Sequence, residues 1–183
     1  MKKFKPDVRW LTRTAVLIAL LITLQWATAG TQVFAGQYIT GSLVNCVLAV
    51  ASLFGGISCG IVVAVLSPFF AFLLGIGPKL IPIVPCIALG NVVFVLVLAL
   101  VSKGALWQRI LGVVLGAVAK FAVLYLAVVQ VLIPLLADAL KAPQVQTFTA
   151  MFSWPQLITA LLGGSLAMFL LPILYKATKK PES

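Results

Sequence analysis

The segment of residues 41–91 constrains the fold more than any other part of the chain. Lys79 is its one charged residue. Most of its other residues are aliphatic or aromatic, and it is interrupted by Gly55-Gly56, Gly60, Ser67-Pro68, Gly75, Gly77-Pro78, Pro82 and Pro85. Water would drive so apolar a segment to aggregate, whereas lipid accommodates it if each backbone N–H and C=O is satisfied within a helix or against protein. We therefore expect several short or bent membrane helices, packed closely through their small residues.

The composition of the whole chain indicates the same class of protein. Of its 183 residues, 63% are hydrophobic and 9% are charged, and the mean hydropathy is +1.21. These values are typical of a polytopic membrane protein, and the length suits about six spans of ~20 residues each. We predict a single all-α integral membrane domain over residues 1–183. Basic tails at 1–13 and 176–183 would flank a six-helix transmembrane bundle at 14–175.

Apolar runs divide the bundle into six expected helices, at residues 15–29, 43–54, 57–74, 81–101, 110–136 and 155–175. We expect a polar loop at 31–42 and a polar connection at 137–153. The run 43–54 is short for a bilayer crossing, and Pro68 should bend the helix that contains it. The basic start followed by Ala27-Thr28-Ala29 also resembles a signal peptide, but a retained first helix better suits a chain with further spans.

The distribution of Lys and Arg predicts the orientation of the helices. With the first tail inside, the cytoplasmic side carries Lys2, Lys3, Lys5, Arg9, Arg13, Lys103, Arg109, Lys176, Lys179 and Lys180. The outside carries Lys79 and Lys141. We therefore expect both termini to be cytoplasmic. Because this topology accounts for the net charge of +10, the partner we expect is the lipid bilayer and not nucleic acid.

Lys120 is the one basic residue deep inside an expected span. An ammonium near the midplane costs about 2.5–3.5 kcal/mol on the translocon scale, so it needs a compensating partner. Gly112, Gly116 and Lys120 share one helix face, which directs the lysine into the protein. Two interpretations stay open. The lysine binds an anionic group of a ligand, such as a carboxylate, or it is structural, either neutral or satisfied by carbonyls opened at Pro82 or Pro85.

Amide and aromatic side chains in or near the spans are candidates to complete a binding cavity. The candidate substrate-binding residues are Asn45, Asn91, Lys120, Gln130, Trp26 and Tyr125, with Gln25 and Trp154 as further lining candidates. Together they would line an outward-facing cavity that is apolar with a few convergent polar groups, as ligand sites usually are. Alternatively, the amides make ordinary interhelical contacts of about 0.6 kcal/mol each, and the tryptophans belong to an interfacial belt.

The chain lacks the residues that catalysis in a membrane would require. Histidine is absent, and the acids Asp7, Asp138 and Glu182 fall in tails or a loop, so no general base or metal-binding carboxylate pair is expected. No GxxxxGK[ST] sequence for ATP hydrolysis occurs. The three cysteines lie singly in apolar runs and are interpreted as small buried hydrophobes. We expect no enzyme activity, no metal and no cofactor, and the lack of an intramembrane acid argues against a stand-alone secondary transporter.

Several motifs together resemble one transporter family. LVN stands near an expected helix start at residues 43–45, LSPFFAFLLGIGP follows a glycine-rich stretch, and ALGN ends at Asn91. In the first helix, Ala15 and Ala19 lie one turn apart and form a shallow patch on which another helix can lie, unless the patch serves packing within the chain. The chain resembles the substrate-binding S components of energy-coupling factor (ECF) vitamin transporters, which use such an AxxxA pair against the coupling helices of their transmembrane partner.

The resemblance implies a function and a set of partners. The protein would bind a vitamin or related small molecule toward the extracellular face, with residues 31–42 closing over it. It would then join a transmembrane coupling protein and two cytosolic ATPases, and topple to deliver its substrate across a bacterial or archaeal plasma membrane.

The substrate class is narrowed by what the sequence lacks. Nickel and cobalt members of the family use an N-terminal Met-His pair and further histidines, whereas Lys2 follows Met1 here and histidine is absent, so a metal substrate is not expected. Lys120 favours a carboxylate-bearing molecule. The alternative function is a non-transporting membrane scaffold or assembly protein.

Overall fold

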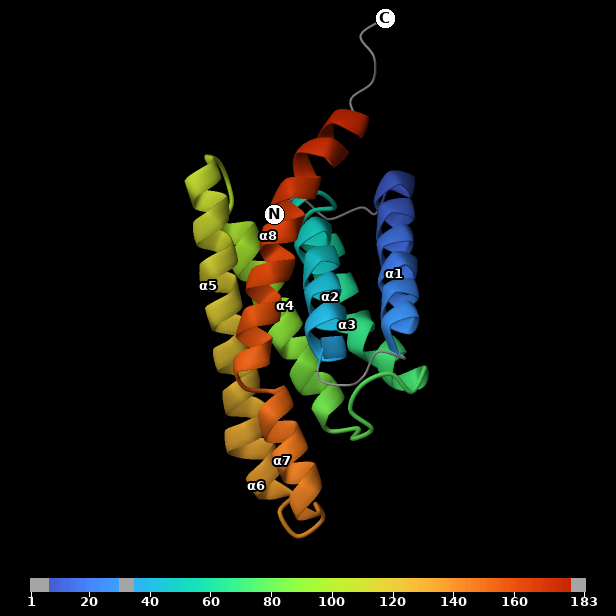
Figure 1. Ribbon diagram of the computed structural model, residues 1–183. Coiled ribbons are helices and arrows are strands. Elements are labelled where there is room, and N and C mark those ends of the chain that lie inside the picture. The colour runs from blue at the N-terminus through green and yellow to red at the C-terminus, as the bar shows by residue number, and fades with distance from the viewer. Residues whose placement is uncertain (1–6, 30–34, 179–183) are drawn as a thin grey trace, which may run out of the picture.

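A computed structural model describes residues 7–29 and 35–178, and the regular structure in these ranges is helical throughout (Figure 1). The elements, in chain order, are α1 (Val8–Thr28), α2 (Ala35–Leu53), α3 (Ile57–Leu73), α4 (Ile83–Val101), α5 (Leu106–Leu124), the π-helix η2 (Tyr125–Leu132), α6 (Ile133–Leu135), α7 (Ala142–Met151) and α8 (Trp154–Thr178). The segment from α5 through η2 to α6 is continuous.

Among the described residues, five helical segments are long and apolar enough to cross a membrane: Val8–Thr28, Gly36–Leu53, Ile83–Val101, Leu106–Leu135 and Ala142–Thr178. A sixth, α3, is apolar but shorter, at 17 residues. These six segments confirm the predicted all-α membrane bundle.

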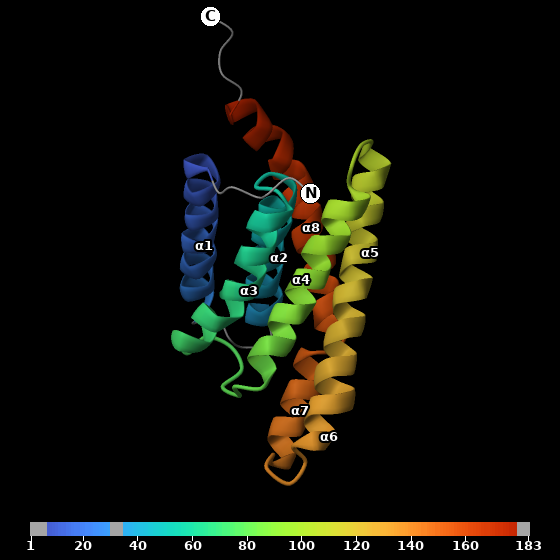
Figure 2. The same ribbon diagram turned by 180° about the vertical axis from the view of Figure 1, so that it is seen from behind.

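In the bundle, α1 and α5 lie on opposite sides, with α2, α3, α4 and α8 between them (Figures 1 and 2). The closest neighbours are α2 with α8, α4 with α5, and α3 with α4. Fully buried residues of the main core include Leu21, Leu48, Val63, Phe94 and Ala160. A second, smaller cluster contains Ile83, Leu124, Val128, Phe148 and Phe152 and joins α4, η2 and α7.

A glycine allows α2 and α8 to approach each other. A Cβ added to Gly163 of α8 would lie 2.6 Å from the Cβ of Asn45 and 2.7 Å from the backbone nitrogen of Cys46, and it would also meet the carbonyl oxygen of Ser42. Small residues at a helix contact let the two backbones touch. Gly163 therefore fixes how deeply α2, and with it Asn45, sits in the bundle.

The predicted polar loop at 31–42 is wrong from residue 35 onward, because α2 begins at Ala35; residues 31–34 lie outside the described ranges. The first turns of α2 contain Gly and Thr, which are weak helix formers, so the sequence did not indicate a helix here. Tertiary hydrogen bonds stabilise it instead. Gln37 Nε2 donates to the carbonyl oxygen of Met151 at 2.8 Å, and Thr40 Oγ1 donates to Thr28 Oγ1 at 2.7 Å.

The predicted polar connection at 137–153 is also wrong in part, because α7 occupies most of it. Pro143 lies in the first turn of α7, where its missing N–H costs nothing, and the Gln144 side chain accepts a hydrogen bond from the backbone N–H of Lys141 at 3.0 Å. Phe148 is buried in the second cluster. One buried aromatic and a capped start are thus enough to order a segment of polar composition.

The prolines of α4 lie where a helix tolerates them. Pro82 immediately precedes α4 and Pro85 falls in its first turn, where the missing N–H has no partner to lose. The predicted span at 110–136 starts earlier, at Leu106, and contains the π-helix η2, a rare form that no sequence pattern predicts here.

The two ends of the bundle differ in charge. The start of α1, the α4–α5 connection and the end of α8 lie together at one end (Figure 1). This end, which we call the basic end, carries Arg9, Arg13, Lys103, Arg109 and Lys176 among the described residues. The opposite end carries Lys79 and Lys141. The cytoplasmic orientation of the basic end stays a prediction from this asymmetry.

Candidate functional site

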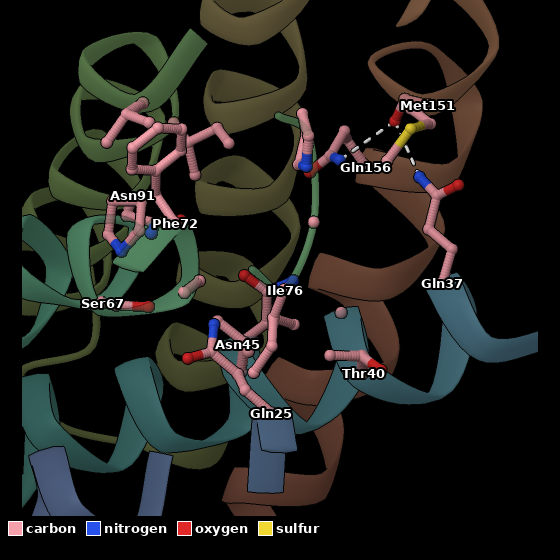
Figure 3. A pocket seen from close by; sticks show the side chains of 18 of the residues that line it. Gln25, Gln37, Thr40, Asn45, Ser67, Phe72, Ile76, Asn91, Met151 and Gln156 are labelled. Carbon is pink, nitrogen blue, oxygen red and sulfur yellow. Dashed lines mark hydrogen bonds between the residues drawn. The ribbon is translucent and has the colours of Figure 1, made fainter. Parts of the chain in front are cut away.

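A cavity of about 160 Å³ (Figure 3) is lined by residues from the parts of the helices that lie away from the basic end of Figure 1. Its polar lining residues come from six helices: Gln25 (α1), Gln37, Thr40 and Asn45 (α2), Ser67 (α3), Asn91 (α4), Lys120 (α5) and Gln156 (α8). Apolar walls are supplied by Pro68, Phe72, Ile76, Val84, Ile87 and Phe152. Lys120 is the one charged residue among the described lining residues. The cavity is therefore apolar with a few convergent polar groups, which is the usual character of a ligand site.

Lys120 joins two asparagines at the inner wall of the cavity. Its Nζ donates to Asn45 Oδ1 at 2.6 Å and to Asn91 Oδ1 at 2.7 Å, and all three side chains are at most 3% exposed. The ring centroid of Phe94 lies 5.8 Å from the same Nζ, within the range of a cation–π contact. The interpretation that carbonyls opened at Pro82 or Pro85 satisfy the lysine is thus wrong, because its acceptors are amide side chains.

Asn91 also donates a hydrogen bond to a backbone carbonyl whose usual helical N–H donor is replaced by a proline. Pro68 lies inside α3 and has no N–H, so the carbonyl of Ala64, four residues earlier, loses its normal helical donor. Asn91 Nδ2 donates to this Ala64 oxygen at 3.4 Å. The proline in α3 and the asparagine in α4 therefore complement each other across the helix contact.

The same hydrogen-bond chain continues on the other side of Lys120. Asn45 Nδ2 donates to Thr159 Oγ1 at 3.4 Å, and Thr159 Oγ1 donates to the carbonyl oxygen of Gln156 at 3.3 Å. The network thus runs from α3 through α4, α5 and α2 to α8. These hydrogen bonds join five helices around the cavity, and a buried polar network of this kind favours one arrangement of the core.

The network also sets which hydrogen-bonding groups face the cavity. An ammonium only donates, so the Oδ1 atoms of Asn45 and Asn91 must face Lys120 and their NH₂ groups must face away from it. Each NH₂ group has a second hydrogen beyond the contact already described, and the ammonium has a third. Because all three residues line the cavity, these remaining hydrogens can serve as donors to a carbonyl or carboxylate on a ligand.

Gln25 supplies a complementary acceptor. Its side chain lines the cavity and is 6% exposed, and Oε1 has no hydrogen-bond partner within the described structure (Figure 3). A buried acceptor left unpaired costs about 1–3 kcal/mol, which an N–H or O–H of a bound molecule would recover. The cavity thus presents donors on one wall and an unused acceptor on another.

The structure brings together three of the six predicted substrate-binding residues: Asn45, Asn91 and Lys120 line the cavity. Trp26, Tyr125 and Gln130 are not among its lining residues. Trp26 is 70% exposed on α1. Gln130 Nε2 donates to the Tyr125 hydroxyl at 3.0 Å on the outer surface of η2.

Four polar lining residues were not predicted from the sequence: Gln37, Thr40, Ser67 and Gln156. Gln37 and Gln156 both donate through Nε2 to the carbonyl oxygen of Met151, at 2.8 and 3.0 Å (Figure 3). Gln37 and Thr40 lie in the segment predicted to be a loop. The signal that could have found Ser67 is its position next to Pro68, where helical backbone geometry is interrupted.

The predicted coupling-face residues lie on the free side of α1. Ala15 and Ala19 are both exposed, whereas Thr14, Leu17, Leu21 and Gln25 of the same helix are buried. The alanine pair therefore forms an accessible shallow patch within the described part of the chain.

Residues 9–175 match the model of the family described as ECF transporter, substrate-specific component. The match spans all six helical segments, and the chain belongs to this family. It is accordingly a multi-pass membrane protein and a substrate-binding, not catalytic, component of a transporter. No curated protein and no solved structure gives a significant match to the chain.

Proposed function

We propose that the protein captures a vitamin or related small molecule from the extracellular side in the cavity around Lys120. It then passes the molecule inward together with a transmembrane coupling protein and two cytosolic ATPases, in a bacterial or archaeal plasma membrane. The observation that carries the proposal is a cavity with a fixed donor wall and an unpartnered acceptor in a chain of this family. Its position opposite the basic end supports the extracellular side.

The volume and chemistry of the cavity narrow the class of substrate. A cavity of about 150 Å³ in another protein holds a benzene-sized molecule, so about 160 Å³ suits a compound built on one ring. The donor wall favours a carboxylate or carboxamide on that ring, and Gln25 favours a second, donating group. Because no acid is among the described residues that line the cavity, a cationic substrate would lack a counter-charge.

The substrate is best identified from the purified protein. After expression in cells grown in rich medium and purification in mild detergent, mass spectrometry should detect one small molecule at about one equivalent per chain. Thermal unfolding should then shift upward with that compound. An empty protein whose unfolding is unmoved by a vitamin panel, nicotinic acid and nicotinamide included, would favour the alternative function of a non-transporting membrane scaffold.

We also propose that Ala15 and Ala19 form the surface for the coupling protein. Replacing both with phenylalanine should abolish substrate uptake and co-purification with the coupling protein, because the side chains fill the shallow patch. Ligand binding by the isolated protein should be unchanged, since neither alanine lines the cavity. The matched control replaces Val114 and Val118 with phenylalanine; these two residues are an exposed pair at the same spacing on α5. Normal uptake by the alanine variant would refute this role.

A further inference from the structure

A second hollow, which we call the α1–α8 groove, runs between α1 and α8 over the surface of α2. Its volume is about 430 Å³, and its lining includes Val16 and Leu20 of α1, Val50 of α2, and Leu166 and Leu170 of α8. Figure 1 shows α2 between the two flanking helices. Arg13 is the one charged residue among the described lining residues, and it lies at the basic end of the groove.

Neighbouring aromatic residues hold Arg13 at this position. Its guanidinium carbon lies 4.9 Å from the centroid of the Phe54 ring. Phe54 in turn packs edge-on against Tyr175, with ring centroids 5.5 Å apart, and the Tyr175 hydroxyl donates to the carbonyl oxygen of Leu53 at 2.7 Å. A guanidinium that stacks on a ring keeps its in-plane N–H donors for other partners.

We propose that the α1–α8 groove is a phospholipid site, in which one acyl chain lies along the apolar lining and the lipid phosphate binds Arg13. The groove matches a phospholipid in shape and in charge, because its lining is apolar and Arg13, the charged residue among the described lining residues, lies at one end. Arginine binds phosphate through paired N–H donors. Arg9 and Lys176 add positive charge at the same end, which favours an anionic headgroup over one that carries a choline cation.

A partner helix fits the groove less well than a lipid chain. A helix with its side chains is about 10–12 Å across, so a groove of about 430 Å³ would hold no more than about one turn of it. The exposed pair Ala15 and Ala19, proposed above as the coupling surface, does not line the groove. The lipid site is therefore separate from both the substrate cavity and that surface.

The test compares the full-length protein with three variants, using palmitoyl-oleoyl phosphatidylglycerol and the matching phosphatidylcholine as probes. Arg13→Gln removes the proposed phosphate ligand. Leu170→Trp, at a position that is 39% exposed, fills the groove. Arg109→Gln removes an arginine from the basic end on the far side of the bundle. After delipidation, native mass spectrometry counts bound lipids across a titration, and size exclusion and thermal unfolding confirm that each variant is folded.

We expect the wild-type protein and Arg109→Gln to bind one phosphatidylglycerol at least tenfold more tightly than phosphatidylcholine. Arg13→Gln should lose this preference, and Leu170→Trp should weaken binding of both lipids at least tenfold. Equal binding of the two lipids by the wild-type protein, or unchanged binding by either groove variant, would overturn the proposal. So would a Leu170→Trp protein that binds lipid normally but no longer assembles with the coupling protein, since the occupant would then be a helix.

Discussion

Replacing Lys120 with methionine is expected to destabilise the protein by about 3 kcal/mol, a large loss for a chain of this size. The substitution keeps the length of the side chain but leaves the Oδ1 atoms of Asn45 and Asn91 buried without their donor. Unfolding in detergent, followed by loss of helical circular dichroism, measures the effect. Lys103→Met, which removes an exposed lysine at the basic end, should change stability by less than about 0.5 kcal/mol.

A combined variant separates the structural role of Lys120, Asn45 and Asn91 from their role in binding. With Asn45→Leu and Asn91→Leu added to Lys120→Met, most of the lost stability should return, because replacing all partners by apolar groups is nearly neutral. A deficit of about 1 kcal/mol should remain for the Ala64 carbonyl, which loses Asn91. Affinity for the co-purifying compound should stay reduced by about 10- to 100-fold. Wild-type affinity in this combined variant would show that these three side chains only support the fold.

Adding a single methyl group to Gly163 is the second change with a large expected effect. Gly163→Ala should cost about 3 kcal/mol or more, because the new Cβ meets backbone atoms of Ser42 and Cys46 that cannot rotate away. The separation of α2 and α8 would also move Asn45 off Lys120, so ligand affinity should fall together with stability. Thermal unfolding and ligand titration on the same preparation measure both.

Gly116→Ala, at the contact of α5 with α4, is the matched comparison for Gly163→Ala. A Cβ at Gly116 of α5 meets side-chain atoms of Phe94 at 3.0 and 3.3 Å, and a side chain can shift by a few tenths of an ångström. Alanine also gains about 1 kcal/mol over glycine within a helix, so the net change should be small. Equal losses at both positions would contradict the view that the backbone contact of α2 with α8 is the rigid one.

The helices that cross the membrane were predictable because their signal is hydrophobicity, which depends on composition and not on partners. The first half of α2 and the whole of α7 were not predictable, because contacts with other segments of the chain stabilise these helices. In α2, Gln37 donates a hydrogen bond to Met151, which is remote in sequence, and Thr40 donates one to Thr28, which lies in the preceding helix. In α7, Phe148 stabilises the helix because it is buried against η2. The π-helix likewise has no marker in its own residues.

For the site, the sequence identified the charged centre and two of its neighbours, since a lysine inside a span must be compensated. It could not predict that these two neighbours, Asn45 and Asn91, are the hydrogen-bond acceptors of Lys120, because this pairing depends on how three helices pack. It also placed Trp26 by depth, and Gln130 on the broad helix face of Lys120. Depth does not determine which side of a helix a residue occupies, and the π-helix η2 changes the helical turn between Lys120 and Gln130. Both side chains are exposed.

The cavity draws one or more lining groups from each of six helices, so a bound molecule would hold them together as a cross-link does. Binding to the folded state alone stabilises a protein by about 2.7 kcal/mol when the ligand is present at 100 times its dissociation constant. With the proposed substrate, the folded fraction of this protein would follow the external supply of nutrient. Empty copies would open more often and reach membrane proteases sooner. Cellular abundance would then adjust to scarcity through turnover, without a change in transcription.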